Sequence, residues 1–135
     1  MSAYYIDSSA AMKLLVPEKE SKALHKFVAS SGATFASSTL IDIEITRNLN
    51  RLYPKGSKAA QAFLDTILKI DITRDIISSA SSLLPQSKLR SLDAIHFATY
   101  KKLSDAFSGM VTYDAVLVNA CQQLGLKVFA PGVAI

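Results

Sequence analysis

The 135-residue sequence predicts an α/β fold with a single domain (residues 1–135), in which a parallel β-sheet is flanked by helices on both faces as a Rossmann-like three-layer sandwich. Short β-rich runs alternate with longer helical patterns along the whole chain. Half of the residues are hydrophobic, which is enough to bury a sizeable core. Neither a repeat, a linker nor a low-complexity tract interrupts the alternation. Strands separated by helices pair in parallel, because each helix returns the chain across the sheet.

The first half of the chain contains two strand-and-helix units and further helices. The run AYYID is β-rich and is followed by turn-forming serines, and the helical pattern after it stops at Pro17. The third helix has apolar residues at helical spacing: Ile41, Ile45, Leu49 and Leu52. The expected strands are 3–7 and 33–38, and the expected helices are 10–16, 18–31, 39–53 and 56–69.

The second half continues the alternation and ends on a strand. Pro85 and the polar loop PQSK end one helix. Gly125 is expected to close the last helix, because glycine readily adopts the left-handed conformation found there. The segment KLRSLDAIHFATY is apolar on nearly every side from residue 92 to 98, which indicates a buried helix. The expected strands are 70–73, 109–113 and 126–131, and the expected helices are 74–84, 88–100 and 114–125.

Composition restricts the class of protein. A single cysteine, Cys121, excludes an internal disulfide and a zinc pair, and its surroundings are typical of a packed helix face. No apolar run approaches the roughly 20 residues that cross a bilayer, and AYYID has no basic leader, so we expect a cytoplasmic protein without a membrane partner. The net charge of +4 is compatible with a polyanionic partner but does not establish one. The mean hydropathy of +0.25 suggests that another chain covers part of the surface.

Four carboxylates stand out, because ligands of an open parallel sheet collect beyond the carboxyl ends of its strands. They follow strands or lie in the first turns of helices: Asp7, Glu44, Asp93 and Asp114. Each one alone is explained as a turn residue or a helix cap, and Ser91 is a suitable N-cap just before Asp93. Glu44 fits this explanation less well, because it lies between isoleucines, where an unpaired charge is costly.

Together, the four acids need a compensating charge. Two carboxylates about 4 Å apart repel by around 4 kcal/mol at an effective dielectric constant of 20. Arg47, one turn after Glu44, is the one basic residue close in sequence to any of them, so a divalent metal is the simpler answer. An all-oxygen site favours Mg²⁺, or Mn²⁺, over zinc. Such an ion can bind a phosphate oxygen and orient a water for in-line attack, which predicts hydrolysis of phosphate esters.

These residues resemble those of PIN-domain ribonucleases, specifically the VapC toxins of bacterial and archaeal toxin–antitoxin modules. The resemblance covers essentially the whole chain and rests on four segments in the expected order: YYIDSSAAMKLLVPE, SSTLIDIEITRNLNR, LRSLDAIHFATY and VTYDAVLVNACQQLGLKVFAP. It implies a PIN-like fold, an Mg²⁺- or Mn²⁺-dependent endoribonuclease acting on RNA, a homodimer and a cognate antitoxin protein. It also implies that the four acids bind the metal and catalyse, with the hydroxyls of Ser9 and Thr112 beside the first and last of them.

One departure from the family pattern concerns the number of metals. Some relatives have a further acid shortly after the last one, whereas here Asp114 is followed by Ala115 and Val116. The occupancy of a second metal position therefore stays open.

Basic residues and a histidine near the acids each have two interpretations. The basic residues follow Glu44 at helical spacing: Arg47, Arg51, Lys55 and Lys58. They either hold RNA phosphates near the metal or form an ordinary solvated helix face, bent by Pro54. His96 lies one turn after Asp93 and either bonds to that carboxylate or fills the core, and we favour a packed, satisfied histidine over a ligand.

Two other functions are considered. A phosphoryl-transfer enzyme of the haloacid-dehalogenase type needs Asp-x-Asp after the first strand, but Ser9 occupies the position of the second acid. A non-catalytic scaffold of the same fold would bind RNA or protein without cleaving it. The presence of all four acids counts against the scaffold.

Overall fold

The computed structural model describes residues 2–135 and contains one five-stranded sheet in which every pairing is parallel. The strands lie in the order β3-β2-β1-β4-β5. Their bounds are β1 Ala3–Ile6, β2 Thr34–Ser38, β3 Leu68–Ile70, β4 Gly109–Val111 and β5 Val128–Phe129. The α/β fold predicted from the sequence is confirmed.

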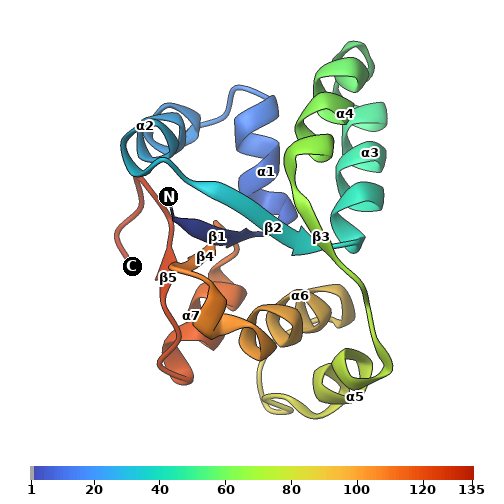
Figure 1. The fold of residues 1–135 in the computed structure, drawn as a ribbon, viewed down its shortest axis with the longest axis vertical. Coiled ribbons are helices and arrows are strands. Elements are labelled where there is room, and N and C mark those ends of the chain that lie inside the picture. Colours follow the sequence, from blue (N-terminus) through green and yellow to red (C-terminus); the bar gives the residue numbers. More distant parts are fainter. Residues whose placement is uncertain (1) are drawn as a thin grey trace.

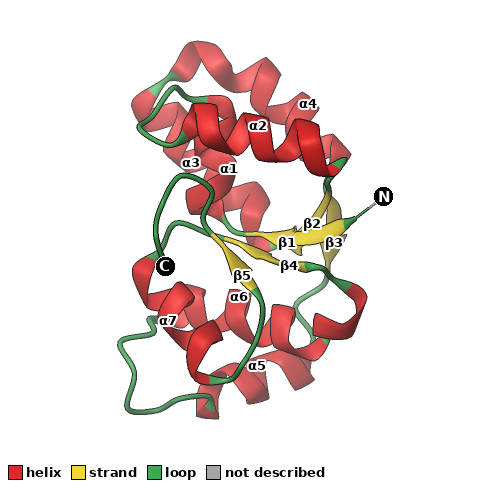
Figure 2. Ribbon diagram, turned by 90° about the vertical axis from the view of Figure 1, so that its left-hand side faces the viewer, coloured by secondary structure: helices red, strands yellow, loops and turns green. Residues whose placement is uncertain are grey.

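Helices cover both faces of the sheet, so that the molecule has three layers (Figures 1 and 2). The upper layer in Figure 1 contains α1 Ser8–Leu15, α2 Ser21–Ser31, α3 Leu40–Leu52 and α4 Ser57–Thr66. The lower layer contains α5 Arg74–Ser82, α6 Ser91–Lys102 and α7 Ala115–Gln123. Two short 3₁₀ helices, η1 Pro54–Gly56 and η2 Ser104–Ala106, complete the described elements. Among residues 2–135, no helix combines the length and the apolar character needed to cross a membrane.

The central strand β1 supplies side chains to two separate cores. Tyr4 and Ile6 belong to the core under α1 and α3, whereas Tyr5 belongs to the core between the sheet and the lower helices. Successive residues of a strand point to opposite faces, so a strand covered on both sides must be apolar throughout. This explains the uninterrupted run AYYI.

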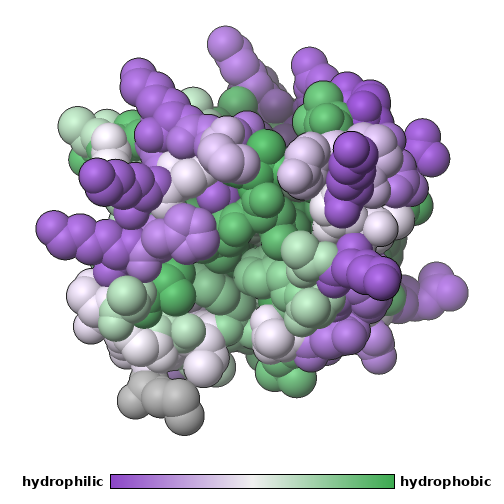
Figure 3. Space-filling model, turned by 90° about the horizontal axis from the view of Figure 1, so that it is seen from above, coloured by the Kyte–Doolittle hydropathy of each residue, from purple (hydrophilic) through white to green (hydrophobic). Residues whose placement is uncertain are grey.

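The upper layer leaves part of its apolar surface uncovered. Seen from above, the molecule has a hydrophobic hollow along its middle, bordered by hydrophilic side chains (Figure 3). Partly buried hydrophobic residues of α1, α2, β2 and α4 pack over the upper core, among them Leu14, Phe27, Phe35 and Phe63. Apolar side chains gathered on one face in this way are typical of a surface that contacts another molecule.

The third strand lies earlier than the sequence predicts. A strand was expected at residues 70–73, but β3 is Leu68–Ile70, and α4 ends at Thr66 instead of residue 69. Ile67 already has an extended backbone, with φ −87° and ψ 130°. Apolar and polar residues alternate from Leu68 to Thr73, so more than one register satisfies the pattern, and pairing of Lys69 with Ser37 of β2 selects one of them.

Two expectations about helix ends have different outcomes. Gly125 follows α7 with φ +67°, which confirms its expected place just beyond the helix. Ser91 is not the N-cap of α6, because the cap residue is Arg90, without a side-chain hydrogen bond. The first turn of α6, which contains Asp93, therefore has no side-chain cap.

Sheet order places two strand ends side by side at a point where the chain changes direction. From β1 the chain builds outward through β2 to β3, and it then returns to place β4 and β5 on the other side of β1. The helices that follow β1 and β4 consequently lie in different layers. In open α/β sheets, ligands bind in the crevice beyond the carboxyl ends of such neighbouring strands.

Candidate active site

Asp7 is the first residue after β1 and is 3% exposed. Its Oδ1 accepts a hydrogen bond from the Ala10 N–H at 3.1 Å, so that it caps α1. Ser9 Oγ donates to the same carboxylate, at 2.8 Å from Oδ1 and 2.9 Å from Oδ2. Thr112 Oγ1 donates to Oδ2 at 2.7 Å. Asp7 is thus a helix cap and also the centre of a buried polar network.

The hydroxyls of Ser9 and Thr112 fasten the end of β1 to the loop after β4. The Tyr113 N–H donates to Ser9 Oγ at 2.9 Å, and the Asp114 N–H donates to Thr112 Oγ1 at 3.1 Å. Because each hydroxyl accepts a backbone proton, its own proton is free to point at Asp7. This network holds the two strand ends, and the acid on each, in a fixed relation.

Asp114 caps α7. Its Oδ1 accepts hydrogen bonds from the Val116 and Leu117 N–H groups at 2.8 and 3.2 Å. Its Oδ2 has no hydrogen-bond partner among residues 2–135. The cap and a role in a site are therefore compatible, since one oxygen serves the helix and the other is left free.

Glu44 reaches the site from α3 in the opposite layer to α6. Its Oε1 lies 2.6 Å from Nε2 of His96, whose other nitrogen, Nδ1, lies 2.6 Å from the hydroxyl of Tyr5. His96 is 1% exposed, so the prediction of a packed, satisfied histidine is confirmed. The alternative bond to Asp93 is not formed: the acid that His96 contacts is Glu44.

Asp93 is half-buried and has neither a hydrogen bond nor an ion pair among residues 2–135. Burial raises the pKa of Asp93, and the negative charges of Asp114 and Asp7, together with that of Glu44, raise it further. The nearby imidazole of His96 lowers it. Because all three other acids act on Asp93, the fold brings the four predicted carboxylates into one neighbourhood.

Burial also raises the pKa of Asp7, while hydrogen bonds from Thr112 and Ser9, and the neighbouring His96, lower it. The two effects oppose each other, because burial disfavours the charged carboxylate whereas donors favour it. A buried carboxylate whose hydrogen-bond partners are all donors is favoured in its ionised form when a cation binds nearby.

The donor set fits a hydrated Mg²⁺ or Mn²⁺ ion. Among residues 2–135, none of the four acids forms an ion pair with Lys or Arg. No three Asp, Glu, His or Cys side chains within that range converge closely enough to hold an ion between them. Mg²⁺ commonly binds one or two carboxylates directly and keeps several waters. Asp93 and Asp114 have free oxygens for direct contact, whereas Asp7 and Glu44 are already hydrogen-bonded and fit an outer position.

The basic residues do not form one helix face. Arg47 and Arg51 lie on α3, but the helix ends at Leu52, so that Lys55 lies in η1 and Lys58 on α4. All four are exposed. The expectation of a continuous stripe is wrong, because Pro54 starts a new helical segment instead of bending the old one.

Arg51 nevertheless lies in a groove that includes Ser9, whose hydroxyl donates to Asp7. The groove has a volume of about 440 Å³ and is lined by residues of α1 and α3, including Ser8, Ser9, Asn48 and Arg51. Lys13 also lines it but is bound to Glu20 at 2.9 Å. Arg51 donates to Asn48 Oδ1 at 3.3 Å and has no acidic partner among residues 2–135, so its charge is available to an anion.

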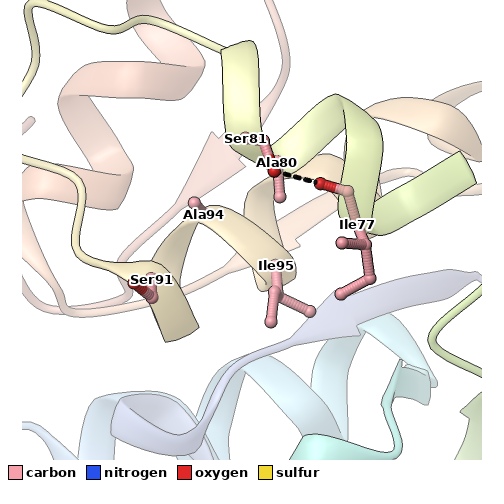
Figure 4. Close-up of a pocket in the computed structure, with 6 residues that line it drawn as sticks. All are labelled: Ile77, Ala80, Ser81, Ser91, Ala94 and Ile95. Carbon is pink, nitrogen blue, oxygen red and sulfur yellow. Dashed lines mark hydrogen bonds between the residues drawn. The ribbon is translucent and has the colours of Figure 1, made fainter. Parts of the chain in front are cut away.

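A second pocket lies between α5 and α6 and contains none of the four acids. It has a volume of about 220 Å³, and its lining is mainly apolar (Figure 4). Ile77 and Ile95 contribute side chains from the two helices, and the hydroxyl of Ser81 is turned to the Ile77 carbonyl at 2.7 Å. Two serine hydroxyls are the polar side-chain groups of its lining, which includes no acid, base or histidine.

A protein-family model described as PIN domain matches residues 4–130. The chain belongs to the PIN-domain family. Similar proteins include Ribonuclease VapC46 of Mycobacterium tuberculosis, which is 37% identical over 97% of this chain and 99% of its own length. Ribonuclease VapC47 of the same species is 33% identical over 95% of this chain and 96% of its own length. The resemblance inferred from the four sequence segments is confirmed.

Solved structures agree with the PIN fold. A toxin–antitoxin complex from Klebsiella pneumoniae contains a chain that superposes with a TM-score of 0.73 at 19% identity, covering 97% of this chain and 99% of that one. Mycobacterium tuberculosis VapC20, described as a Sarcin-Ricin loop cleaving toxin, superposes with a TM-score of 0.74 at 20% identity, covering 88% and 95%. At these identities the likeness establishes the arrangement of the elements.

Proposed function

We propose that this PIN-domain protein is a metal-dependent endoribonuclease and the toxin of a type II toxin–antitoxin pair. The observation that supports the proposal is a group of four acids near the carboxyl ends of β1 and β4, none of which is paired with Lys or Arg among residues 2–135. Relatives that are 33 to 37% identical over nearly the full chain have the name Ribonuclease VapC.

Each acid has a distinct part in the proposed reaction. Asp93 and Asp114 would hold Mg²⁺ or Mn²⁺, which would supply positive charge to the scissile phosphate and to the leaving oxygen. Asp7 keeps the ends of β1 and β4 together through Ser9 and Thr112, and its negative charge helps to orient the attacking water. Glu44 approaches from α3 and closes the opposite side of the site.

RNA is proposed to reach these acids through the groove beside α3. Arg51 offers a guanidinium to a phosphate next to the scissile one, and Asn48, Ser8 and Ser9 offer hydrogen bonds. Arg47, one turn earlier on α3, is exposed and adds positive charge to the approach. The groove therefore supports a single RNA strand that passes from basic to acidic surroundings.

The cognate antitoxin is proposed to cover the apolar hollow of the upper layer (Figure 3). An amphipathic helix that lays its apolar face into such a groove is a common mode of recognition. The hollow adjoins α1 and α3, which also border the RNA groove, so an occupant could obstruct access to the acids. One structural neighbour is a toxin–antitoxin complex, which supports a protein partner for this chain.

A homodimer and a cytoplasmic location complete the proposal. Ile77 and Leu92, on α5 and α6, are 45% and 48% exposed, and the apolar pocket between these helices adds to the surface that a second copy would bury. Sedimentation of the purified protein tests the dimer. A monomer over the whole accessible concentration range would contradict it.

RNA cleavage by the purified protein tests the proposed activity. Total RNA is incubated with the protein in EDTA, Mg²⁺ or Mn²⁺, and the new ends are sequenced. We expect defined cuts with either metal, none in EDTA and none with Asp93→Asn. Asp105→Asn, which alters an exposed acid on η2, is the control and should cut as the wild type does. Metal-independent binding of RNA without cuts would support the scaffold instead.

A further inference from the structure

The buried contact between His96 and Glu44 goes beyond a catalytic role for the four acids. His96 lies on α6 in the lower layer, Glu44 lies on α3 in the upper layer, and Tyr5 lies on β1 between them. Tyr5 and His96 are 0% and 1% exposed. The three side chains therefore form a polar connection through all three layers at the edge of the site.

The hydrogen-bond partners favour one placement of the protons. The Ser38 N–H donates to the Tyr5 hydroxyl at 3.1 Å, and the Tyr5 proton can then be directed at Nδ1 of His96. With Nδ1 as an acceptor, a proton on Nε2 completes the contacts of the ring. Nε2–H faces Oε1 of Glu44 at 2.6 Å, which is the length of a strong hydrogen bond to a carboxylate.

We propose that His96, set in one tautomer by Tyr5, is a positioning residue that fixes the rotamer of Glu44 at the metal site. The inference rests on the proposed function, because it gives Glu44 its place beside the ion. Glu44 has three side-chain torsions and starts from a helix in the other layer, so without a partner it would sample many positions. One oxygen held by His96 leaves Oε2 for the ion or one of its waters, and outer hydrogen bonds of this kind orient metal-binding carboxylates.

The same contact explains how α6 organises the site. The helix carries Asp93 in its first turn and His96 in the next, so that one rigid element supplies one acid and holds another. Movement of α6 relative to α3 would therefore change both at once. The pocket between α5 and α6, by contrast, contacts neither.

Two substitutions of His96 separate its two contacts. His96→Gln places an amide N–H near the position of Nε2 and keeps the donor to Glu44. The shorter side chain of His96→Asn reaches only the position of Nδ1, so it keeps a polar group near the Tyr5 hydroxyl and loses the contact with Glu44. Thr99→Val is the matched control, because Thr99 is a buried polar residue of the same helix whose hydroxyl donates to the Ile95 carbonyl.

Mn²⁺ affinity by calorimetry and steady-state RNA cleavage are measured on each variant, with urea unfolding to record stability. For His96→Asn we expect Mn²⁺ affinity and kcat to fall about 10- to 100-fold, with KM for RNA unchanged. His96→Gln should stay within about threefold of the wild type, on the same principle that the donor to the carboxylate matters. Thr99→Val should lose stability without losing Mn²⁺ affinity.

Several outcomes overturn the inference. Wild-type Mn²⁺ affinity and kcat in His96→Asn would overturn it. Equal losses of these two quantities in His96→Asn and His96→Gln would overturn it as well. If His96→Asn does not fold, nitrogen-15 NMR of the wild type decides: the inference requires a proton on Nε2, and a proton on Nδ1 alone contradicts it. A wild-type protein that neither binds Mn²⁺ nor cuts RNA would overturn the proposed function as well, so the two failures are distinguishable.

Discussion

Replacement of Thr112 by valine removes the hydroxyl that joins the ends of β1 and β4. Thr112 is fully buried, and its Oγ1 both donates to Asp7 at 2.7 Å and accepts the Asp114 N–H at 3.1 Å. Valine has nearly the same shape, so packing changes little while both hydrogen bonds disappear. The substitution therefore isolates the polar contribution of one atom.

The size of the effect follows from the two contacts. A hydrogen bond to a charged group contributes about 1.5 to 3 kcal/mol, and a buried N–H without a partner costs about 1 to 3 kcal/mol. Asp114 is only half-buried, so water can replace part of the second loss. The two contributions add to about 2.5 to 6 kcal/mol, and we expect Thr112→Val to lower the free energy of unfolding by about 3 kcal/mol, near the lower end of that combined range.

Urea unfolding of Thr112→Val and Thr112→Ser measures this difference. Serine keeps the hydroxyl and should lose about 1 kcal/mol for the missing methyl group. The pKa of Asp7 is already raised by burial, and it should rise further when a donor is removed. A protonated Asp7 needs fewer donors, so the deficit of the valine variant should shrink as the pH falls toward 4. Equal stability of the two variants at pH 7 would contradict a stabilising role for the Thr112 hydroxyl.

Four further predictions concern Asp93, Arg51 and Cys121. Asp93→Asn should stabilise the metal-free protein. Because the folded-state pKa of Asp93 is raised, the wild type loses stability as the pH rises above the ordinary value of 3.8. The gain in the free energy of unfolding, measured with urea, should therefore grow from pH 4 to pH 7, and a gain that is independent of pH would contradict this. Added Mn²⁺ should raise the melting temperature of the wild type but not of Asp93→Asn. Arg51→Gln should raise KM for RNA and lower the salt dependence of binding by about one phosphate contact, with kcat unchanged; a fall in kcat alone would place Arg51 elsewhere. Burial raises the pKa of Cys121 to about 12, so its thiol should react with a disulfide reagent only after unfolding, and rapid labelling of the folded protein would contradict its place in the core.

Patterns in the sequence were sufficient to predict the sheet and the position of two of the acids relative to its strands. Asp7 and Asp114 follow strands, and parallel strands necessarily place their carboxyl ends at one edge. Alternation of strands and helices predicted the layers for the same local reason. These inferences needed only the order of elements along the chain.

The polar network could not be predicted in the same way, because its members are far apart in the chain. Glu44 and His96 are 52 positions apart, and Thr112 is 105 positions from Asp7. The nearest acid to His96 in sequence is Asp93, and helical spacing therefore suggested the wrong partner. The contact with Glu44 depends on how α3 and α6 meet across the sheet edge, which periodicity does not specify.

The predicted ends of helices and strands were wrong where the local sequence pattern was compatible with more than one set of bounds. Apolar and polar residues alternate from residue 68 to 73, beyond the end of β3, so pairing with β2, and not propensity, determined the bounds of β3. The basic residues after Glu44 have helical spacing in the sequence, but Pro54 begins η1. Lys55 therefore does not lie on the same helix as Arg47 and Arg51.

Anomalous diffraction from crystals soaked in Mn²⁺ shows directly whether these acids bind a metal. We expect a manganese peak beyond the ends of β1 and β4, within direct reach of Asp93 and Asp114 and with Asp7 and Glu44 in its outer shell. A peak at another place, or none at all in crystals of protein that still cuts RNA, would contradict the assignment of these acids.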